Sequence, residues 1–473
     1  MCVYPYERTL QKRSGIGDYV VNIIVELSKY LLVILIILYT FQCFNVFNKK
    51  QERTKKRLMR KQLVLIVLMD TVAFLVIYLK TNEIRSVLFY GEIMAYLLAV
   101  QVLYRLFYKK ASMLLINNMC MLLNIGFIII YRLDTEKANR QFMIVAAGSA
   151  VALIVPVLIR KMKFLVKLTW LYAAIGMLGL MAVLVLAQVT GGAKLSIFGF
   201  QPSEFIKIVF VFFLAAALHQ GPDFRQVCKV TVVAAIHVLV LVFSRDLGSA
   251  LVFFITYLVM VYVATKKPLY FFGGLLGLSA ASVVAYFLFG HVRQRVVAWK
   301  DPFSVYDQEG YQIVQSMFAI GTGSWFGMGL YQGSPKSIPV VQEDFVFSAI
   351  CEELGGVFAI CMILICMSFF LMLVNISLQI KNPFYKLIAL GLGTEYAFQV
   401  FLHIGGATKF IPMTGITLPL VSYGGSSALS TIIMLGIIQG LYILREDEDE
   451  ELEQIRKARK EEGQIGGQAG QGS

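Results

Sequence analysis

The amino-acid sequence predicts an all-α integral membrane protein, a polytopic bundle of about 13 transmembrane helices with a large extracytoplasmic loop. The chain is 58% hydrophobic and only 15% charged over its 473 residues. Soluble domains are about 45–50% apolar and about 25% charged, so a soluble fold is excluded. The apolar residues also form continuous runs of about 20 residues, without the alternation that is typical of a membrane β-barrel.

The apolar runs divide the chain into three regions. Residues 1–110 form an N-terminal membrane extension with three predicted spans, and residues 111–445 contain ten. Residues 446–473 are predicted to be a charged cytoplasmic tail, a short helix followed by disorder. The expected spans are 20–47, 63–80, 86–107, 112–131, 141–160, 166–188, 203–219, 228–243, 247–264, 270–290, 345–376, 384–405 and 425–443.

The basic loops predict the orientation of these spans. The loop 48–62, "FNKKQERTKKRLMRK", is the most basic short loop and is therefore expected in the cytoplasm. Alternation then places the basic segments 108–112, 160–163 and 265–268 on the same side. The N-terminus falls outside and the C-terminus inside. The outer face receives three segments, 189–202, 291–344 and 406–424.

The remaining composition excludes several other classes of protein. The net charge of +14 comes from basic residues beside apolar spans, where they act as topology signals, so no nucleic-acid partner is expected. The seven Cys are scattered without a CxxC pair and are interpreted as packing residues. The four His make no ligand cluster, and no cleavable signal peptide is expected at the N-terminus.

The outer loop 291–344 is dense in polar and aromatic residues, as in "HVRQRVVAWKDPFSVYDQEGYQIVQS" (291–316). A loop of about 50 residues is usually functional or disordered. Because this loop contains Trp299, Trp325 and little low-complexity sequence, we expect it to be folded and functional.

Ionisable residues inside apolar spans are costly and therefore mark candidate sites. Glu204 and Lys207 are three residues apart and share one helix face, so they either pair as a structural cap or belong to the site. Arg245 and Asp246 stand at an outer boundary, as an ion pair that closes a turn or as part of an outward-facing polar cavity. Asp70, Glu92 and Glu395 are expected to pair with neighbouring helices.

Two further segments also point to the outer face. Glu352 and Glu353 are adjacent and point about 100° apart on a helix, so one is free to face a cavity while the other caps or pairs. The stretch 406–430, "GATKFIPMTGITLPLVSYGGSSALS", predicts broken or re-entrant backbone, which membranes tolerate only where protein or water covers it. Together they indicate a water-accessible cavity that opens outward.

Six motifs resemble the SEDS family, the FtsW, RodA and SpoVE proteins of bacterial elongation, division and sporulation. They occur in the family's order and spacing across roughly residues 110–445, and residues 1–110 lie outside the resemblance. The motifs are "GAKLSIFGFQPSEFIK" (192–207), "RDLGSALVFF" (245–254), "RQRVVAWKDPF" (293–303), "GYQIVQSMFAIGTGSWFGMGL" (310–330), "IPVVQEDFVFSAICEELG" (338–355) and "LPLVSYGGSS" (418–427).

The resemblance implies a ten-helix core in the bacterial cytoplasmic membrane and a peptidoglycan glycosyltransferase activity. Members polymerise lipid II, the undecaprenyl-pyrophosphate-linked disaccharide pentapeptide, on the outer face. They work with a class B penicillin-binding protein and with other membrane proteins of division or elongation. The loop 291–344 falls where the family has its catalytic loop.

That reaction needs a base for the attacking hydroxyl and a cation for the leaving pyrophosphate. Asp307 and Asp301 are the candidate bases, with Asp307 preferred. Arg, Lys or a divalent cation such as Mg²⁺ or Mn²⁺ suits the leaving group, and no protein metal ligands are assigned. The candidate substrate-binding residues are Arg293, Arg295, Lys207, Glu204, Arg245, Asp246, Glu352, Glu353, Ser422 and Tyr423.

The chain departs from the family pattern at two positions. The essential Asp of the family stands six residues before the Gly-Tyr aromatic, and the residue at that position here is Val305. Arg245 stands where relatives have Gln and adds a cation near the cavity mouth. The missing acid leaves open a non-catalytic scaffold that activates a class B penicillin-binding protein. Polar residues within the spans and a central cavity leave open a second alternative, a lipid II flippase.

Overall fold

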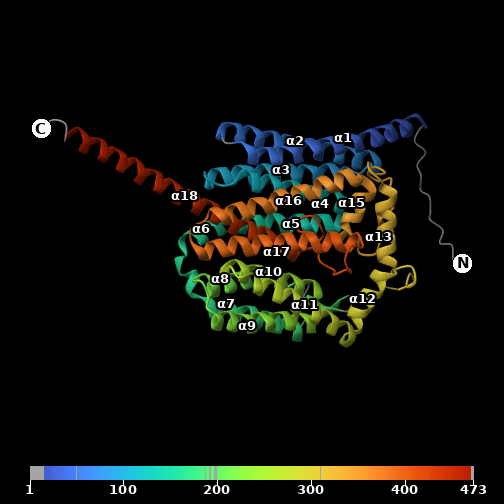
Figure 1. Cartoon of the computed structure of the whole chain (residues 1–473). Helices are drawn as coiled ribbons and strands as arrows, with labels where there is room; N and C mark the ends of the chain where they lie inside the picture. The colour runs from blue at the N-terminus through green and yellow to red at the C-terminus, as the bar shows by residue number, and fades with distance from the viewer. Residues whose placement is uncertain are drawn as a thin grey trace.

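The computed structural model describes residues 15–49, 51–186, 188–190, 193–196, 200–308 and 310–469. Most of its long helices lie roughly parallel to one another in a single bundle (Figure 1). Within these ranges, 12 helices are long and apolar enough to cross a membrane. The expected number of 13 is not confirmed, because the segment 203–219 forms α8 (Ser203–Leu218), whose 16 residues fall short of about 20.

Three helices form the N-terminal extension along one side of the bundle (Figure 1). Helix α1 packs against α2 and α16. Helix α2 packs against α4 and also against α3, which follows it in the chain. The bounds are α1 (Gly15–Asn48), α2 (Glu52–Thr81) and α3 (Ile84–Phe107).

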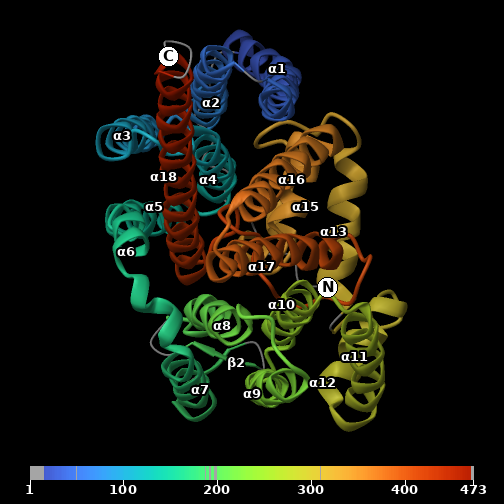
Figure 2. The same ribbon diagram turned by 60° about the vertical axis from the view of Figure 1, so that its left-hand side comes forward.

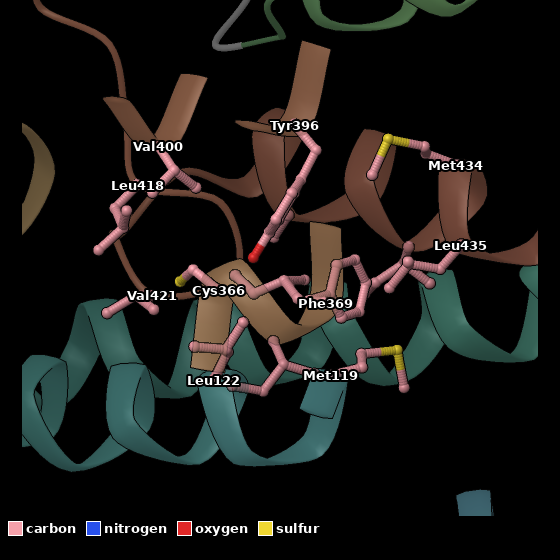
Figure 3. Packing of buried hydrophobic residues seen from close by; sticks show 14 of the residues in the cluster. Met119, Leu122, Cys366, Phe369, Tyr396, Val400, Leu418, Val421, Met434 and Leu435 are labelled. Atoms are coloured by element: carbon pink, nitrogen blue, oxygen red, sulfur yellow. The ribbon is translucent and has the colours of Figure 1, made fainter. Parts of the chain in front are cut away.

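The remaining long helices build the core of the bundle. Figure 3 shows its centre, where apolar side chains of α4, α16, α17 and α18 interlock, among them Met119, Phe369, Tyr396 and Leu435. Nearly all of α4 is buried, so this helix is the central element. The bounds are α4 (Met113–Leu133), α5 (Thr135–Ala152), α6 (Val155–Lys161), α7 (Thr169–Leu186), α9 (Phe224–Phe243), α10 (Leu247–Thr265), α11 (Pro268–Leu288), α16 (Gly356–Gln379), α17 (Pro383–Ala407) and α18 (Gly425–Ala469).

Two expected spans are broken into shorter helices. The span 141–160 divides between α5 and α6, where Pro156 stands in the first turn of α6 and has no N–H for a continuous helix. The span 345–376 divides at Gly355 into α15 (Val346–Leu354) and α16. Gly355 has φ +92°, and a Cβ there would clash with the backbone of Trp325 and Gly327, so only glycine fits this break.

The predicted outer loop folds into short helices at one end of the bundle (Figure 1). They are α12 (Gly290–Lys300), α13 (Gly310–Gly323), the 3₁₀ helix η2 (Pro335–Ser337) and α14 (Val341–Asp344), and α15 follows directly. A 3₁₀ turn η1 (Lys163–Lys167) precedes α7, and a two-stranded antiparallel hairpin, β1 (Gln188–Thr190) and β2 (Ala193–Ser196), follows it.

Helix α18 leaves the bundle at the opposite end and projects away from it (Figure 1). It stays helical as far as Ala469, through a segment where the sequence predicted a short helix followed by disorder. Its base is held by Lys110, whose Nζ lies 2.7 Å from Asp447 and 2.6 Å from Glu450, and by Arg160 at 2.6 Å from Asp447.

Candidate functional site

Helix α12 carries two arginines that point in different directions. Arg295 donates hydrogen bonds to the carbonyls of Thr414, at 3.2 Å, and Met413, at 3.4 Å. Trp299 donates to the carbonyl of Lys409 at 3.1 Å. These three hydrogen bonds hold α12 on the segment 406–424. Arg293, two residues away and therefore about 200° around the helix, is exposed.

The Arg295 guanidinium interacts with two carboxylates, Asp246 and Asp344. Burial raises the pKa of Asp344 to about 6; neighbouring Glu343 raises it further, and Arg295 opposes the rise. Burial also raises the pKa of Asp246, while hydrogen bonding to Ser249 and the charge of Arg295 oppose this. These three residues are called the Arg295 cluster, because Arg295 on α12 lies within electrostatic range of Asp344 on α14 and of Asp246 directly before α10.

Asp246 has a clear structural role as well. Its carboxylate accepts a hydrogen bond from the backbone N–H of Ser249 at 3.0 Å and caps the N-terminus of α10. Arg245, with φ +62°, makes the left-handed turn between α9 and α10. The expected tight turn at this boundary is therefore present, and it directs Asp246 toward Arg295.

Glu204 and Lys207 pair deep inside the bundle, where both side chains are buried. The Nζ of Lys207 lies 2.6 Å from Glu204 and donates to Gln399 at 2.8 Å. Ser430 donates to Glu204 at 3.1 Å. The pair faces a cavity of only about 10 Å³, which is too small for a sugar. Its contacts are those of a structural ion pair that joins α8, α17 and α18.

Glu352 and Glu353 contact a different part of the molecule from the Arg295 cluster. The Nη2 of Arg132 on α4 lies 2.9 Å from the Oε1 of Glu353. The guanidinium carbon of Arg132 lies 4.2 Å from the centroid of the Tyr331 ring. Glu352 accepts a hydrogen bond from the backbone N–H of Ser334 at 2.7 Å. Both glutamates thus hold the segment 327–334 against α4 and α15.

Ser422 and Tyr423 fasten α14 in place. The Ser422 hydroxyl donates to the carbonyl of Glu343 at 2.6 Å, and the Tyr423 N–H donates to the carbonyl of Gln342 at 2.7 Å. Lys137 of α5 pairs with Glu343 at 3.3 Å. These bonds position Asp344, which the sequence analysis did not select although it lies inside the motif "IPVVQEDFVFSAICEELG".

The two candidate bases lie on the loop after α12, and both are exposed. Asp301 ends α12 and accepts a hydrogen bond from the N–H of Ser304 at 3.4 Å. Asp307 follows Val305, whose carbonyl accepts from Gln308 at 3.1 Å and from Gly310 at 3.0 Å. Asp307 therefore lies on a hydrogen-bonded turn with its side chain exposed. Glu309, the third acidic residue of this loop, lies outside the described residues.

An apolar cavity of about 910 Å³ lies between α9, α10, α11 and α17. Arg295, Val292 and Val296 of α12 line it. Its apolar walls include Phe254, Leu278 and Phe401. None of the side chains of α11 is buried, so this helix forms a thin outer wall. An apolar space with an arginine in its lining suits an amphiphile with an apolar tail and an anionic head.

Known proteins with similar sequences identify the family of this chain. Residues 110–446 match the family model FTSW_RODA_SPOVE, described as a cell cycle protein. The chain belongs to this family. RodA of Mycobacterium tuberculosis, called a peptidoglycan glycosyltransferase, is 34% identical over 367 residues, which are 71% of this chain and 78% of that protein. Stage V sporulation protein E of Bacillus subtilis is 30% identical over 360 residues, covering 70% of this chain and 97% of the relative.

Solved structures in this family have the same fold. A chain of a peptidoglycan synthase complex matches with a TM-score of 0.60 at 26% identity and covers 70% of this chain and 97% of that chain. RodA of Thermus thermophilus matches with a TM-score of 0.54 at 24% identity, covering 70% of this chain and 96% of that chain. The helices α1 to α3 precede the residues that match the family model.

Proposed function

We propose that this family member is a peptidoglycan glycosyltransferase that polymerises lipid II at the outer face of the cytoplasmic membrane. The observation that carries the proposal is the apolar cavity of about 910 Å³ that Arg295 lines. A polyprenyl tail fits such a cavity, and the pyrophosphate at its head then reaches the guanidinium. The relatives named peptidoglycan glycosyltransferase support the same activity.

The chemistry divides between Arg295 and the loop 301–308. The 4-hydroxyl oxygen of one disaccharide attacks the anomeric carbon of another while a carboxylate, Asp307 or Asp301, accepts its proton. The bond between the anomeric carbon and the pyrophosphate oxygen breaks, and polyprenyl pyrophosphate leaves with the electron pair. Arg295 stabilises that charge with the N–H groups that do not bond to Met413 and Thr414.

No step in this scheme is assigned to a divalent metal. Among the residues that the structure describes, no three His, Cys, Asp or Glu side chains gather in a group that could hold a metal ion. The protein group that we place at the pyrophosphate is Arg295 of α12, which lines the cavity.

A class B penicillin-binding protein is proposed as the partner that crosslinks the product. The support is the similar chain solved within a peptidoglycan synthase complex, described as coordinating polymerization and crosslinking. We also propose that the end of the bundle with α12 and α13 faces outward, because the basic segment 48–62, which joins α1 to α2 and forms the first turns of α2, lies at the opposite end.

The experiment is lipid II polymerisation by the purified protein, with and without its class B penicillin-binding protein. Asp307→Ala is expected to abolish glycan product, while Asp301→Ala retains it. Gln308→Ala, an exposed neighbour on the same turn, is the matched control and is expected to keep wild-type activity. Activity that survives both Asp substitutions together would contradict a carboxylate base in this loop.

A non-catalytic scaffold is the second candidate function. It is favoured by the presence of Val305 at the position of the acidic residue of the family. Its side chain stands where the family has an acid, and its carbonyl closes the turn. A scaffold would produce no glycan itself and would raise the transpeptidase activity of its partner. Polymerisation by wild-type protein alone would exclude this alternative.

A further inference from the structure

A groove outside the proposed catalytic site lies between the extension and the core. It occupies about 440 Å³ between α3 and α5, which neighbour each other at the edge of the bundle (Figure 2). Its walls are apolar, and four alanines contribute to them, Ala95 and Ala99 on α3 and Ala146 and Ala150 on α5. In each helix the two alanines are four residues apart and therefore share one face.

The floor of the groove is closed by direct contacts between the two helices. The hydroxyl groups of Tyr96 and Ser149 share a hydrogen bond of 2.9 Å. The rings of Tyr96 and Phe142 pack with their centroids 6.1 Å apart. The groove is thus a shaped depression with a solid floor, and it is open on the side that faces the membrane.

Glu92 lines this groove and is exposed. It lies eight residues into α3, about 12 Å along the helix axis, which is well inside a hydrocarbon layer about 30 Å thick. No hydrogen bond or ion pair joins its side chain to any residue that the structure describes, although the sequence predicted a partner on a neighbouring helix. A carboxylate at this depth is costly unless a cation pairs with it.

We propose that this groove docks one transmembrane helix of another membrane protein, and that this helix carries a Lys or Arg that pairs with Glu92. The alanine walls allow a helix backbone to approach closely. The carboxylate selects a helix with a cation at the matching depth. The proposal does not depend on the catalytic activity, because the groove needs α3, which precedes the residues that match the family.

Two other occupants fit the same surface less well. A lipid acyl chain fills an apolar groove but has no cation to pair with Glu92. A second copy of this chain would have to present a basic residue at membrane depth. Its most exposed span, α11 (Pro268–Leu288), has neither Lys nor Arg.

The test uses the full chain in phosphatidylcholine vesicles and two synthetic helices of about 24 residues rich in Leu and Ala. One peptide carries a single Lys about nine residues from its end, and the other has Leu there. Energy transfer between a dye on the protein and a dye on the peptide measures the dissociation constant. The Lys peptide is expected to bind about 3- to 20-fold more tightly than the Leu peptide.

Four variants make the result specific to the groove. Glu92→Gln keeps the shape and removes the charge, so it is expected to abolish the preference for Lys. Ala99→Phe fills the groove and is expected to weaken both peptides. Glu83→Gln at the start of α3 and Val102→Phe, which is exposed and does not line the groove, are the matched controls and should bind as wild type.

The outcomes either support the docking site or overturn it. Equal binding of the two peptides to the wild type would show that the groove holds only apolar chains, as for a lipid. A preference for Lys that persists in Glu92→Gln would place the recognition elsewhere, as would weak binding in both matched controls. Absence of binding by either peptide would also overturn the proposal.

Discussion

Arg295 connects the apolar cavity with the charged residues of the site. Its side chain lines the cavity, bonds two backbone carbonyls and interacts with Asp246 and Asp344. Arg293, which was selected from the same motif, lies on the opposite face of the helix and is exposed. The two arginines therefore have separable roles, and only Arg295 is fixed in the site.

We predict that Arg295→Ala lowers lipid II polymerisation by roughly 10²-fold, because it removes the cation nearest the leaving group. Arg295→Lys keeps the charge but loses the planar fork of donors, and it is expected to recover only part of the rate. Lys300→Ala, at the exposed end of α12, serves as the control. Wild-type turnover in Arg295→Ala would exclude this residue from catalysis.

Asp344 makes the stability of the protein depend on pH. Burial raises its pKa from 3.8 to about 6, so the folded state binds this proton more tightly than the unfolded state. The stabilising effect is complete below about pH 4 and is lost as the pH rises through about 6. We predict that Asp344→Asn removes this part of the pH dependence and raises the melting temperature at neutral pH.

Thermal unfolding in detergent between pH 4 and pH 8 measures the effect. Glu136→Gln at the exposed start of α5 is the control, since that carboxylate is not among the groups that shift the pKa of Asp344. A melting curve of Asp344→Asn that follows the wild type at every pH would contradict the assignment.

At the scale of elements, Arg132 and Glu353 join α4 to α15. Their side chains are 10% and 1% exposed, so the pair is largely removed from solvent. Each charge is therefore compensated by its partner in the pair. The Arg132 charge opposes the effect of burial, which raises the pKa of Glu353 to about 7. The same arginine reaches the carbonyl of Gly333 at 3.3 Å, so it also fixes the loop before α14.

Removal of one partner should therefore cost more than removal of both. We predict that Arg132→Ala lowers the free energy of unfolding by about 3–5 kcal/mol, because it leaves a buried carboxylate unpaired. The double variant Arg132→Met, Glu353→Gln is expected to recover most of this loss. Lys137→Ala breaks a pair that is 31% and 36% exposed and should cost less than about 1 kcal/mol. An equal loss in both single variants, measured by denaturant unfolding, would refute the argument.

At the scale of the whole molecule, the extension α1–α3 is packed onto the core through polar as well as apolar contacts. Asn117 of α4 donates to Gln62 of α2 at 3.0 Å and accepts from Gln101 of α3 at 2.8 Å. Asn124 of α4 donates to Asp70 of α2 at 2.7 Å, which provides the partner that the sequence predicted for Asp70. Without the extension, these amides of α4 would face lipid.

We predict that a chain beginning at residue 108 unfolds at a lower temperature than the full chain, because buried amides lose their partners in hydrocarbon. Co-expression of residues 1–107 as a separate chain is expected to restore the melting temperature. Asn117→Leu in the truncated chain should recover part of the loss. A truncated chain as stable as the full one would show that the extension is energetically independent.

Much of the architecture could be predicted because its signals are local. Runs of apolar residues are the direct signature of spanning helices, and six motifs in order identified the family across residues 110–446. The break at Gly355 was not predicted, because the requirement comes from Trp325 and Gly327, which approach it from another segment. The predicted helix at 203–219 exists, but it ends after 16 residues.

The sequence by itself determined the membrane class, the family and the loop that carries the candidate carboxylates, because composition, run length and motif order are properties of neighbouring residues. Only the tertiary structure decided which charges meet. It separated Glu352 and Glu353 from the Arg295 cluster, brought Asp344 into it, and left Glu92 open to the membrane. The physical reason is that a buried charge is positioned by the partners that compensate it, and those partners stand far away along the chain.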